Sequence, residues 1–409
     1  MYIYKVAVIG AGAMGSGIAQ VISYAGIPVI LKDVKKEQVD RGLAAVRHIY
    51  QGRVDRGKMT ASEMEQKMAL VTGVTDYSGF SDVDLVIEAI FEDVSVKQKL
   101  FCELELVCSE NTLLTSNTSS LPISAIAAPT KRPEKVIGFH FFNPAPAMKL
   151  VEIIPGMATS RETIDDLVMF SESIRKIPIR VTECAGFLVN RLLMPYLNEA
   201  SMSLQEGEAE ASALDKTMVA FGMPMGPFAL LDTIGIDVSV KVAEILYDAY
   251  GPRMKPAKIL NALYHAGRLG VKSGFGFYGP YGDSEQSGNV STDGLSEIVS
   301  AIGASKSSSH VSLSSRLVMS MVNEAVIALQ EGVASANDID IAMMAGTGFP
   351  QDKGGPLHYA DQIGIDTVLS ELKKLAAEQG ERFWPAPMLK RMVDANYLGK
   401  KTGQGFFRY

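Results

Sequence analysis

The chain has 409 residues, of which 47% are hydrophobic and 21% charged, as in ordinary globular proteins of two or three domains. Its net charge of −7 argues against nucleic acid or an anionic membrane as partner. The sequence contains no run of 18 apolar residues, so no membrane span is predicted. The three cysteines (Cys102, Cys108 and Cys184) lack metal-ligand spacing. We therefore expect no metal site, and reduced thiols in a reducing compartment.

The first predicted strand begins within a few residues of Met1, which leaves no room for a signal or transit peptide. We expect a cytoplasmic protein.

Residues 5–25 combine an apolar β-branched run, a Gly-x-Gly-x-x-Gly turn and a stretch with helical spacing. Gly10 permits the tight turn, Gly12 lets the backbone approach a pyrophosphate, and Gly15 lets the helix lie near the strand. The N-terminus of the helix, with Ala13 and Met14, offers unpaired N–H groups to that anion. This pattern predicts a dinucleotide site; the alternative is a glycine-rich turn in a plain α/β unit.

The next strand, residues 28–32, ends at Asp33, at about the 20-residue distance expected for a ribose-binding acid. Its carboxylate would accept hydrogen bonds from both ribose hydroxyls and would repel a 2′-phosphate. The sequence therefore favours NAD over NADP, although Lys32, Lys35 and Lys36 weaken that preference.

Residues 36–69 are polar with helical spacing that is broken near Gly52 and Gly57. Arg53, Arg56 and Lys58 lie close together there. They form either a solvated helical face or a site for the phosphates of a nucleotide-bearing substrate.

Further apolar runs predict strands that alternate with helices, which indicates a doubly wound parallel sheet of the Rossmann type. These strands are expected at residues 69–72, 83–89, 113–116, 136–140 and 150–155. Ligands bind at the carboxyl ends of such strands, where Asn117, Ser119 and His140 fall.

A histidine at that edge can act as a general base, because its reference pKa of about 6.5 is near neutral pH. A carboxylate on the neighbouring strand can hold the ring in one tautomer and stabilise the imidazolium. Glu152 lies in the apolar run 150–154 and needs a polar partner there. His140 and Glu152 are therefore candidates for catalysis, although a single histidine is equally often structural.

Asn117, Ser119, Ser120 and Asn143 are neutral hydrogen-bonding groups at the same edge, suited to polarising a carbonyl oxygen or simply to forming turns. Asn190 lies among apolar neighbours at the start of the helical part. It either links helices or reaches the substrate.

From Gly186 onward only helical patterns occur, and they are repeated. Asn198-Glu-Ala recurs at 323 and Leu204-Gln-Glu-Gly at 329, both displaced by 125 residues. Asp232-x-Ile-Gly-Ile-Asp recurs at 361 and Gly274-x-Gly-Phe at 403, both displaced by 129. We predict a nucleotide-binding domain at 1–184, a helical domain at 185–280, a linker at 281–311 with a short helix at 295–302, and a second all-α copy at 312–409.

Several motifs together closely resemble the L-3-hydroxyacyl-CoA dehydrogenase family over nearly the whole chain. They are Gly-Ala-Gly-Ala-Met-Gly from 10, Ser-Asn-Thr-Ser-Ser-Leu from 116, Gly-Phe-His-Phe-Phe-Asn-Pro from 138, Lys-Leu-Val-Glu-Ile-Ile-Pro from 149, Gly-Phe-Leu-Val-Asn-Arg from 186 and Met-Gly-Pro-Phe from 225. The resemblance implies oxidation of the 3-hydroxyl of an acyl-CoA thioester by NAD, a step of fatty-acid β-oxidation or its 3-hydroxybutyryl-CoA equivalent.

The resemblance also implies roles for single residues. His140 would be the base and Glu152 its orienting partner. The substrate would be contacted by Ser119, Asn143 and Asn190, and the cofactor by Asp33, Glu92, Lys97, Asn117 and the glycine-rich turn. Independently of the resemblance, the cation cluster at 53–58 makes Arg53 and Lys58 the candidate contacts of the coenzyme A phosphates.

Short family members dimerise through one helical domain, whereas this chain has two copies and so resembles the dehydrogenase portion of multifunctional β-oxidation enzymes. The second copy has no asparagine matching Asn190; the corresponding segment is Leu-Ser-Ser-Arg-Leu-Val from 313. We expect that copy to be structural and to replace the dimer partner, giving a monomer or a weak dimer. An enoyl-CoA hydratase or a thiolase is a possible partner.

Two alternatives to this function remain open. One is a related dehydrogenase that acts on a free β-hydroxyacid, and the other is a dinucleotide-binding protein with a structural role.

Overall fold

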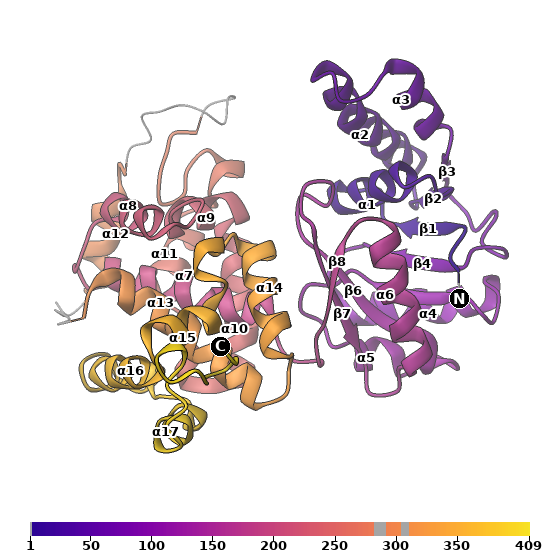
Figure 1. The fold of residues 1–409 in the computed structure, drawn as a ribbon. Coiled ribbons are helices and arrows are strands. Elements are labelled where there is room, and N and C mark those ends of the chain that lie inside the picture. The colour runs from indigo at the N-terminus through magenta and orange to yellow at the C-terminus, as the bar shows by residue number, and fades with distance from the viewer. Residues whose placement is uncertain (1, 282–291, 304–310) are drawn as a thin grey trace. The chain divides into compact units, whose positions relative to one another are not determined.

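The computed structural model describes residues 2–281, 292–303 and 311–409, which form two compact units, Met1–Phe187 and Leu188–Tyr409 (Figure 1). Most of the expected linker, residues 282–291 and 304–310, lies outside the described residues. The short helix expected at 295–302 is present as α12 (Leu295–Ile302).

The first unit contains an eight-stranded sheet with the order β3-β2-β1-β4-β5-β6-β7-β8. The strands are β1 (Val6–Ile9), β2 (Val29–Lys32), β3 (Val71–Val74), β4 (Leu85–Glu88), β5 (Leu113–Ser116), β6 (Val136–Phe141), β7 (Leu150–Pro155) and β8 (Ile177–Arg180). The predicted Rossmann-type doubly wound sheet is confirmed. The sheet is mostly parallel, and β7 runs antiparallel to β6, a reversal that the sequence did not predict.

Helices flank this sheet. They are α1 (Ala13–Tyr24), α2 (Lys36–Asp55), α3 (Ala61–Met68), α4 (Val94–Val107), α5 (Ile123–Ala127) and α6 (Arg161–Ser173), with a 3-10 turn η1 (Pro133–Lys135). One core cluster joins α1, α2 and α6 to the sheet through buried side chains such as Ile18, Val46 and Phe170. The helix α2 continues through Gly52, where a break was expected, and ends before Gly57, which has a φ of +65°.

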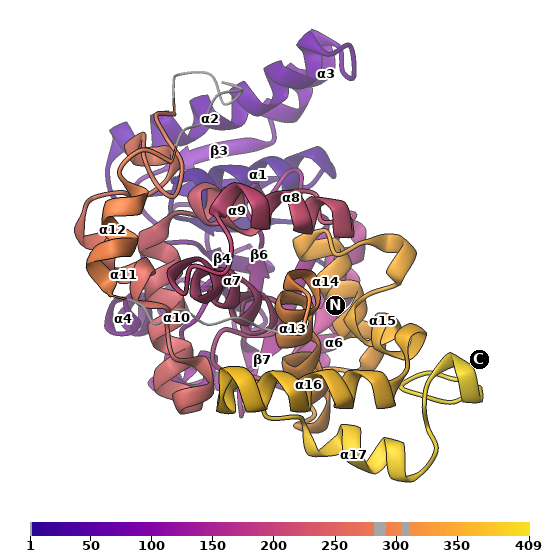
Figure 2. The ribbon, with the colours of Figure 1, turned by 90° about the vertical axis from the view of Figure 1, so that its left-hand side faces the viewer.

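The second unit is helical. It contains α7 (Val189–Gln205), α8 (Ala211–Phe221), α9 (Pro227–Ile234), α10 (Ile236–Tyr250), α11 (Lys258–His265) and α12, then α13 (Leu313–Gln330), α14 (Ala336–Thr347), α15 (Pro356–Ile363), α16 (Ile365–Gln379) and α17 (Pro387–Asp394). Short 3-10 turns are η2 (Gly251–Met254), η3 (Val271–Ser273), η4 (Gln351–Lys353), η5 (Glu381–Phe383) and η6 (Lys400–Thr402). The two long helices α7 and α13 pack against each other (Figure 2). No helix of the described residues is long and apolar enough to cross a membrane.

The repeated motifs form the same local structure in both halves of this unit. The carboxylate of Asp232 accepts hydrogen bonds from the backbone N–H groups of Phe277 and Tyr278, and Asp361 accepts them from Phe406 and Phe407. A Cβ on Gly276 would lie 1.9 Å from Asp232, and a Cβ on Gly405 would lie 2.0 Å from Asp361. The glycines recur because a side chain would collide with the buried carboxylate.

Candidate active site

The glycine-rich turn between β1 and α1 has the geometry that its sequence predicts. Gly10 has a φ of +101°, and a Cβ on Gly15 would lie 1.7 Å from the carbonyl oxygen of Gly10. Gly12 and Ala13 are exposed, and a Cβ on Gly12 would meet no atom within 4 Å. The first turn of α1, which also holds Met14, has no side-chain cap or acidic residue, so its N–H groups are available to an anion.

Asp33 follows β2 and lies against this turn. Its Oδ2 accepts a hydrogen bond of 2.8 Å from the backbone N–H of Ala11, and its Oδ1 accepts one of 2.7 Å from Val34. The carboxylate is thus fixed beside the phosphate-binding turn while remaining partly exposed. Open space at Gly12, uncapped N–H groups and an anchored carboxylate together fit the diphosphate and ribose of a dinucleotide.

His140 and Glu152 form the central pair of the site. Antiparallel pairing of β6 with β7 places the two residues directly opposite each other. The Nδ1 atom of His140 lies 2.7 Å from Oε2 of Glu152, and the two residues are only 6% and 0% exposed. A carboxylate on Nδ1 fixes the ring tautomer, which makes Nε2 the nitrogen that can exchange a proton with a substrate.

Asn117 connects the ends of two strands. It follows β5, and its Oδ1 accepts a hydrogen bond of 2.8 Å from the backbone N–H of Phe141 at the end of β6. Its own N–H donates to the carbonyl of Glu88 at the end of β4. Asn117 therefore ties together the edge from which His140 projects.

Ser119, Glu92 and Lys97, all expected near cofactor or substrate, are joined by hydrogen bonds and ion pairs. Glu92 Oε1 accepts from both the backbone N–H (2.7 Å) and the hydroxyl (3.1 Å) of Ser119. The ammonium of Lys97 lies 3.4 Å from Glu92 and 2.5 Å from Glu88. Lys97 is 1% exposed, so its expected contact with the cofactor stays a prediction.

The sequence did not single out Glu88, although it organises this network. Its side chain is fully buried and accepts hydrogen bonds from Lys97, from the hydroxyl of Ser116 (2.5 Å) and from the backbone of Ile90 (2.7 Å). A carboxylate at the end of an otherwise apolar strand was the available signal, because a buried charge requires partners.

Asn143 is exposed and lies in the loop from β6 to β7. The buried ammonium of Lys176 donates to the carbonyls of Ala145 and Met148 in this loop, each at 2.6 Å, and burial lowers its pKa to about 8. Asn190 lies in the first turn of α7, in the second unit. Its expected contact with substrate stays a prediction.

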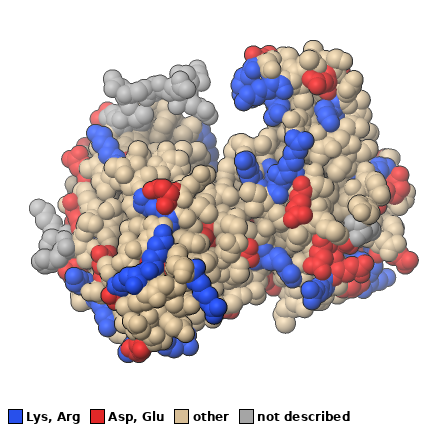
Figure 3. Space-filling view, viewed as in Figure 1, with Lys and Arg blue, Asp and Glu red and all other residues tan. Residues whose placement is uncertain are grey.

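The expected phosphate contacts lie near the α2–α3 hairpin. The guanidinium of Arg53 stacks 4.4 Å from the ring of Tyr24 and donates to its hydroxyl at 2.8 Å. Lys67 and Arg175 also lie over this ring, each at 5.9 Å, whereas Lys58 is exposed beyond the end of α2. Lys and Arg side chains gather over the tip of the hairpin (Figure 3).

The described residues contain no cluster of ligands that could hold a metal ion, and Cys102, Cys108 and Cys184 form no disulfide.

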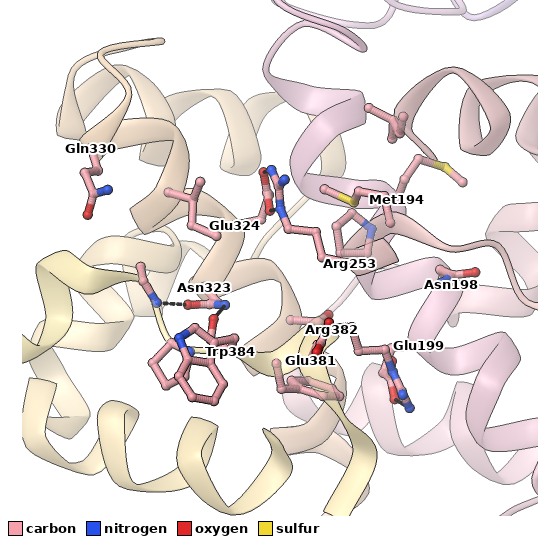
Figure 4. A pocket seen from close by; sticks show the side chains of 18 of the residues that line it. Met194, Asn198, Glu199, Arg253, Asn323, Glu324, Gln330, Glu381, Arg382 and Trp384 are labelled. Carbon is pink, nitrogen blue, oxygen red and sulfur yellow. Dashed lines mark hydrogen bonds and ion pairs between the residues drawn. The ribbon is translucent and has the colours of Figure 1, made fainter. Parts of the chain in front are cut away.

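A cavity of about 260 Å³ lies in the second unit, between α7 and α13 and the segment around Trp384 (Figure 4). Two asparagines of its lining are already hydrogen-bonded within the protein. Asn198 pairs with the backbone of Lys255 and Ala257, and Asn323 pairs in the same way with Trp384 and Ala386. We therefore interpret the cavity as part of the interface between the two helical repeats.

Comparison with known proteins follows the same division of the chain. The family model described as 3-hydroxyacyl-CoA dehydrogenase, NAD binding domain, matches residues 5–184. The model described as 3-hydroxyacyl-CoA dehydrogenase, C-terminal domain, matches twice, at 186–279 and 313–409.

Individual relatives agree with the two family models. The fatty acid oxidation complex subunit alpha of Idiomarina loihiensis is 42% identical over 95% of this chain, which spans only 55% of that relative's length. The crystal structure of 3-hydroxybutyryl-CoA dehydrogenase from Escherichia coli K12 is 34% identical with a TM-score of 0.86, covering 97% of this chain and 100% of that one. The structure of (S)-3-hydroxybutyryl-CoA dehydrogenase from Ralstonia eutropha is 38% identical with a TM-score of 0.66, covering 68% of this chain and 99% of that one.

Proposed function

The chain belongs to the 3-hydroxyacyl-CoA dehydrogenase family, a family of NAD-dependent oxidoreductases, and on this premise we propose that it interconverts an (S)-3-hydroxyacyl-CoA and the corresponding 3-ketoacyl-CoA in β-oxidation or the related 3-hydroxybutyryl-CoA step. The observation that carries the proposal is the buried pair of His140 and Glu152 at the carboxyl end of β6. It lies on the sheet edge that also carries the glycine-rich turn and Asp33.

In the proposed reaction Nε2 of His140 removes the proton of the 3-hydroxyl, and the C3–O single bond becomes a carbonyl. The glycine-rich turn and Asp33 would hold NAD, whose chemistry when bound would be acceptance of the hydride from C3. Glu152 stabilises the imidazolium as it forms. Ser119, Asn143 and Asn190 supply neutral hydrogen-bonding groups for the reacting oxygens.

A mutation of the histidine tests this proposal. His140→Gln should lower kcat by about 10²- to 10⁴-fold, the usual contribution of a general base, and should leave the Kd for NADH nearly unchanged. The assay follows NADH with acetoacetyl-CoA in one direction and (S)-3-hydroxybutyryl-CoA in the other. Turnover of His140→Gln close to wild type would remove this residue from the mechanism.

The thioester is favoured over a free hydroxyacid because two of the similar structures are named 3-hydroxybutyryl-CoA dehydrogenases. Cations at the α2–α3 hairpin suit the phosphates of coenzyme A, with Arg53 held on Tyr24 and Lys58 exposed. Equal kcat/KM with free 3-hydroxybutyrate and with its thioester would reject this choice.

We also propose the domain limits 1–184, 185–280 and 312–409, with a linker at 281–311, and the ranges of the two matched models support them. We propose further that the second helical copy takes the place of a dimer partner, which makes the chain a monomer. Reciprocal ion pairs between the copies support this. Arg191 of α7 lies 2.7 Å from Glu324 of α13, and Arg316 of α13 lies 2.5 Å from Glu199 of α7. Each pair is the other's equivalent, displaced by 125 residues, as in an isologous dimer interface.

The apolar residues beside these pairs have the same arrangement. Leu317, Val318 and Met321 of α13 are at most 2% exposed within the single chain. Sedimentation or elution mass should correspond to one chain. A stable dimer that requires these three side chains would contradict the proposal.

We also propose a reducing, cytoplasmic location, which is consistent with three cysteines that form no disulfide. Association with an enoyl-CoA hydratase or a thiolase stays a prediction, testable by co-purification with those activities.

A further inference from the structure

Two phenylalanine rings lie against the imidazole of His140. The ring of Phe142 has its centroid 4.6 Å away and is tilted by 57°, and the ring of Phe187 has its centroid 5.9 Å away and is tilted by 58°. Phe142 comes from the end of β6, two residues beyond the histidine. Phe187 comes from a different segment, the last residue of the first unit.

The backbone of Phe187 is unusual. Its φ is +52°, a left-handed conformation that a bulky side chain rarely adopts, and the preceding Gly186 has a φ of +73°. The N–H of Phe187 donates to the carbonyl of Cys184 at 3.1 Å. This turn places the ring of Phe187 beside the histidine. The residue is only 1% exposed to solvent. A sterically disfavoured backbone at such a place calls for a functional explanation.

The hydrogen bond to Glu152 leaves the histidine incompletely oriented. One bond fixes where Nδ1 lies, but the plane of the ring can still tilt about that contact. Packing against two aromatic rings removes this freedom and excludes water from the imidazole. The direction in which Nε2 points therefore depends on these rings as well as on the carboxylate.

We propose that Phe187 is a positioning residue for His140: its ring, delivered by the left-handed turn at Gly186-Phe187, holds the imidazole plane in the orientation needed for proton transfer. This inference rests on the proposed function, in which His140 is the base. Phe187 itself touches neither substrate nor cofactor in this role.

Two substitutions separate the ring from the backbone. Phe187→Gly removes the ring and accepts the positive φ without strain, whereas Phe187→Ala removes the ring and keeps the strain. Both should lower kcat by about 10- to 100-fold, the cost of a misplaced catalytic group, with the Kd for NADH changed less than about threefold. Phe187→Leu, which keeps apolar bulk, should recover part of the loss. If Phe187→Gly keeps wild-type kcat, the ring has no positioning role.

A double-mutant cycle shows whether the effect passes through the histidine. In a His140→Gln background, Phe187→Gly should change the residual rate by less than about twofold, because no base remains to be oriented. An equal loss in both backgrounds would mean that Phe187 acts on the general fold, and the proposal would be wrong.

Phe170→Leu is the matched control. Phe170 is a buried phenylalanine of the same unit, and the centroid of its ring lies 6.2 Å from that of Phe139. Its substitution should lower the temperature of unfolding without changing kcat. A failure of the proposed function would be recognised separately. The single variant His140→Gln would then keep its activity, whatever the result for the Phe187 variants.

Discussion

Replacing Glu152 by glutamine tests how much of the rate comes from the charge beside His140. The side chain is fully buried and glutamine has nearly the same volume, so the packing of β7 should be retained. The amide oxygen can still accept the hydrogen bond from Nδ1, which is 2.7 Å long in the native pair. What is lost is the negative charge that faces the imidazolium.

The size of the effect follows from this geometry. When His140 takes the proton, two unit charges lie about 4 Å apart between their centres, which gives about 4 kcal/mol at an effective dielectric constant of about 20. Glutamine retains a neutral hydrogen bond to the ring, which offsets about 1 kcal/mol of this loss. A net loss of about 2–3 kcal/mol corresponds to a kcat lowered by about 30- to 200-fold.

The assay is single-turnover formation of NADH with (S)-3-hydroxybutyryl-CoA, so that product release does not mask the chemical step. Glu105→Gln is the control. The Glu105 side chain, 7% exposed, accepts hydrogen bonds from the backbone of Lys131 and Arg132, and its loss should lower stability alone. A Glu152→Gln rate within twofold of wild type would refute the electrostatic argument.

Four further predictions concern binding and stability. Gly12→Ala should fold normally, because its Cβ meets open space, and should raise the Kd for NADH by about tenfold or more; Gly15→Ala should cost about 3 kcal/mol of stability, because its Cβ collides with the carbonyl of Gly10. Burial holds the pKa of Lys176 at about 8, below its unfolded value of 10.5, so the unfolded chain binds the extra proton between these pH values. The unfolding free energy of wild type relative to Lys176→Met should therefore rise with pH, by at most about 1.4 kcal/mol per unit above pH 8, in urea titrations. Arg316→Met removes a buried cation that pairs with Glu199, Glu206 and Glu208, and should cost about 3–5 kcal/mol by the same method.

The parts of the site that could be predicted depend on local chemistry. The glycines at 10, 12 and 15 and the acid at 33 have fixed tasks at fixed spacing, and the structure places them accordingly. The position of the Glu152 carboxylate in an apolar run predicted a polar partner for it. That reasoning required only that buried charges be paired.

Other features depend on tertiary structure and left little trace in the sequence. The direction of β7 is set by how the loop from 142 to 149 turns back, so its antiparallel register with β6 was missed. The strand β8 was missed because two of its four residues, Ile177 and Arg180, are exposed and its pattern is weakly apolar. Phe187 resembled an ordinary core residue, because a positive φ at a non-glycine position has no signature in the sequence.

The two helical copies show which features have been retained. An aspartate occupies the same place in each, half-buried Asp215 in the first and buried Asp340 in the second, and each accepts hydrogen bonds from two backbone N–H groups at the start of the following helix. The third donor differs. In the first copy it is the hydroxyl of Tyr278, and in the second it is Nδ1 of His358 at 2.6 Å.

This exchange explains a paired difference between the copies. The second copy has phenylalanine, Phe407, where the first has Tyr278, and His358 stacks on that ring at 3.6 Å while supplying the missing hydrogen bond. A buried carboxylate left short of a donor would be costly, so loss of one donor requires gain of another. Asn190, by contrast, corresponds to a serine, Ser315, in the second copy. Residues that satisfy buried charges or form the interface between the copies are the same in both or are replaced by residues that do the same task. The candidate substrate contact, Asn190, is not. This pattern is expected if the second copy serves to complete the fold.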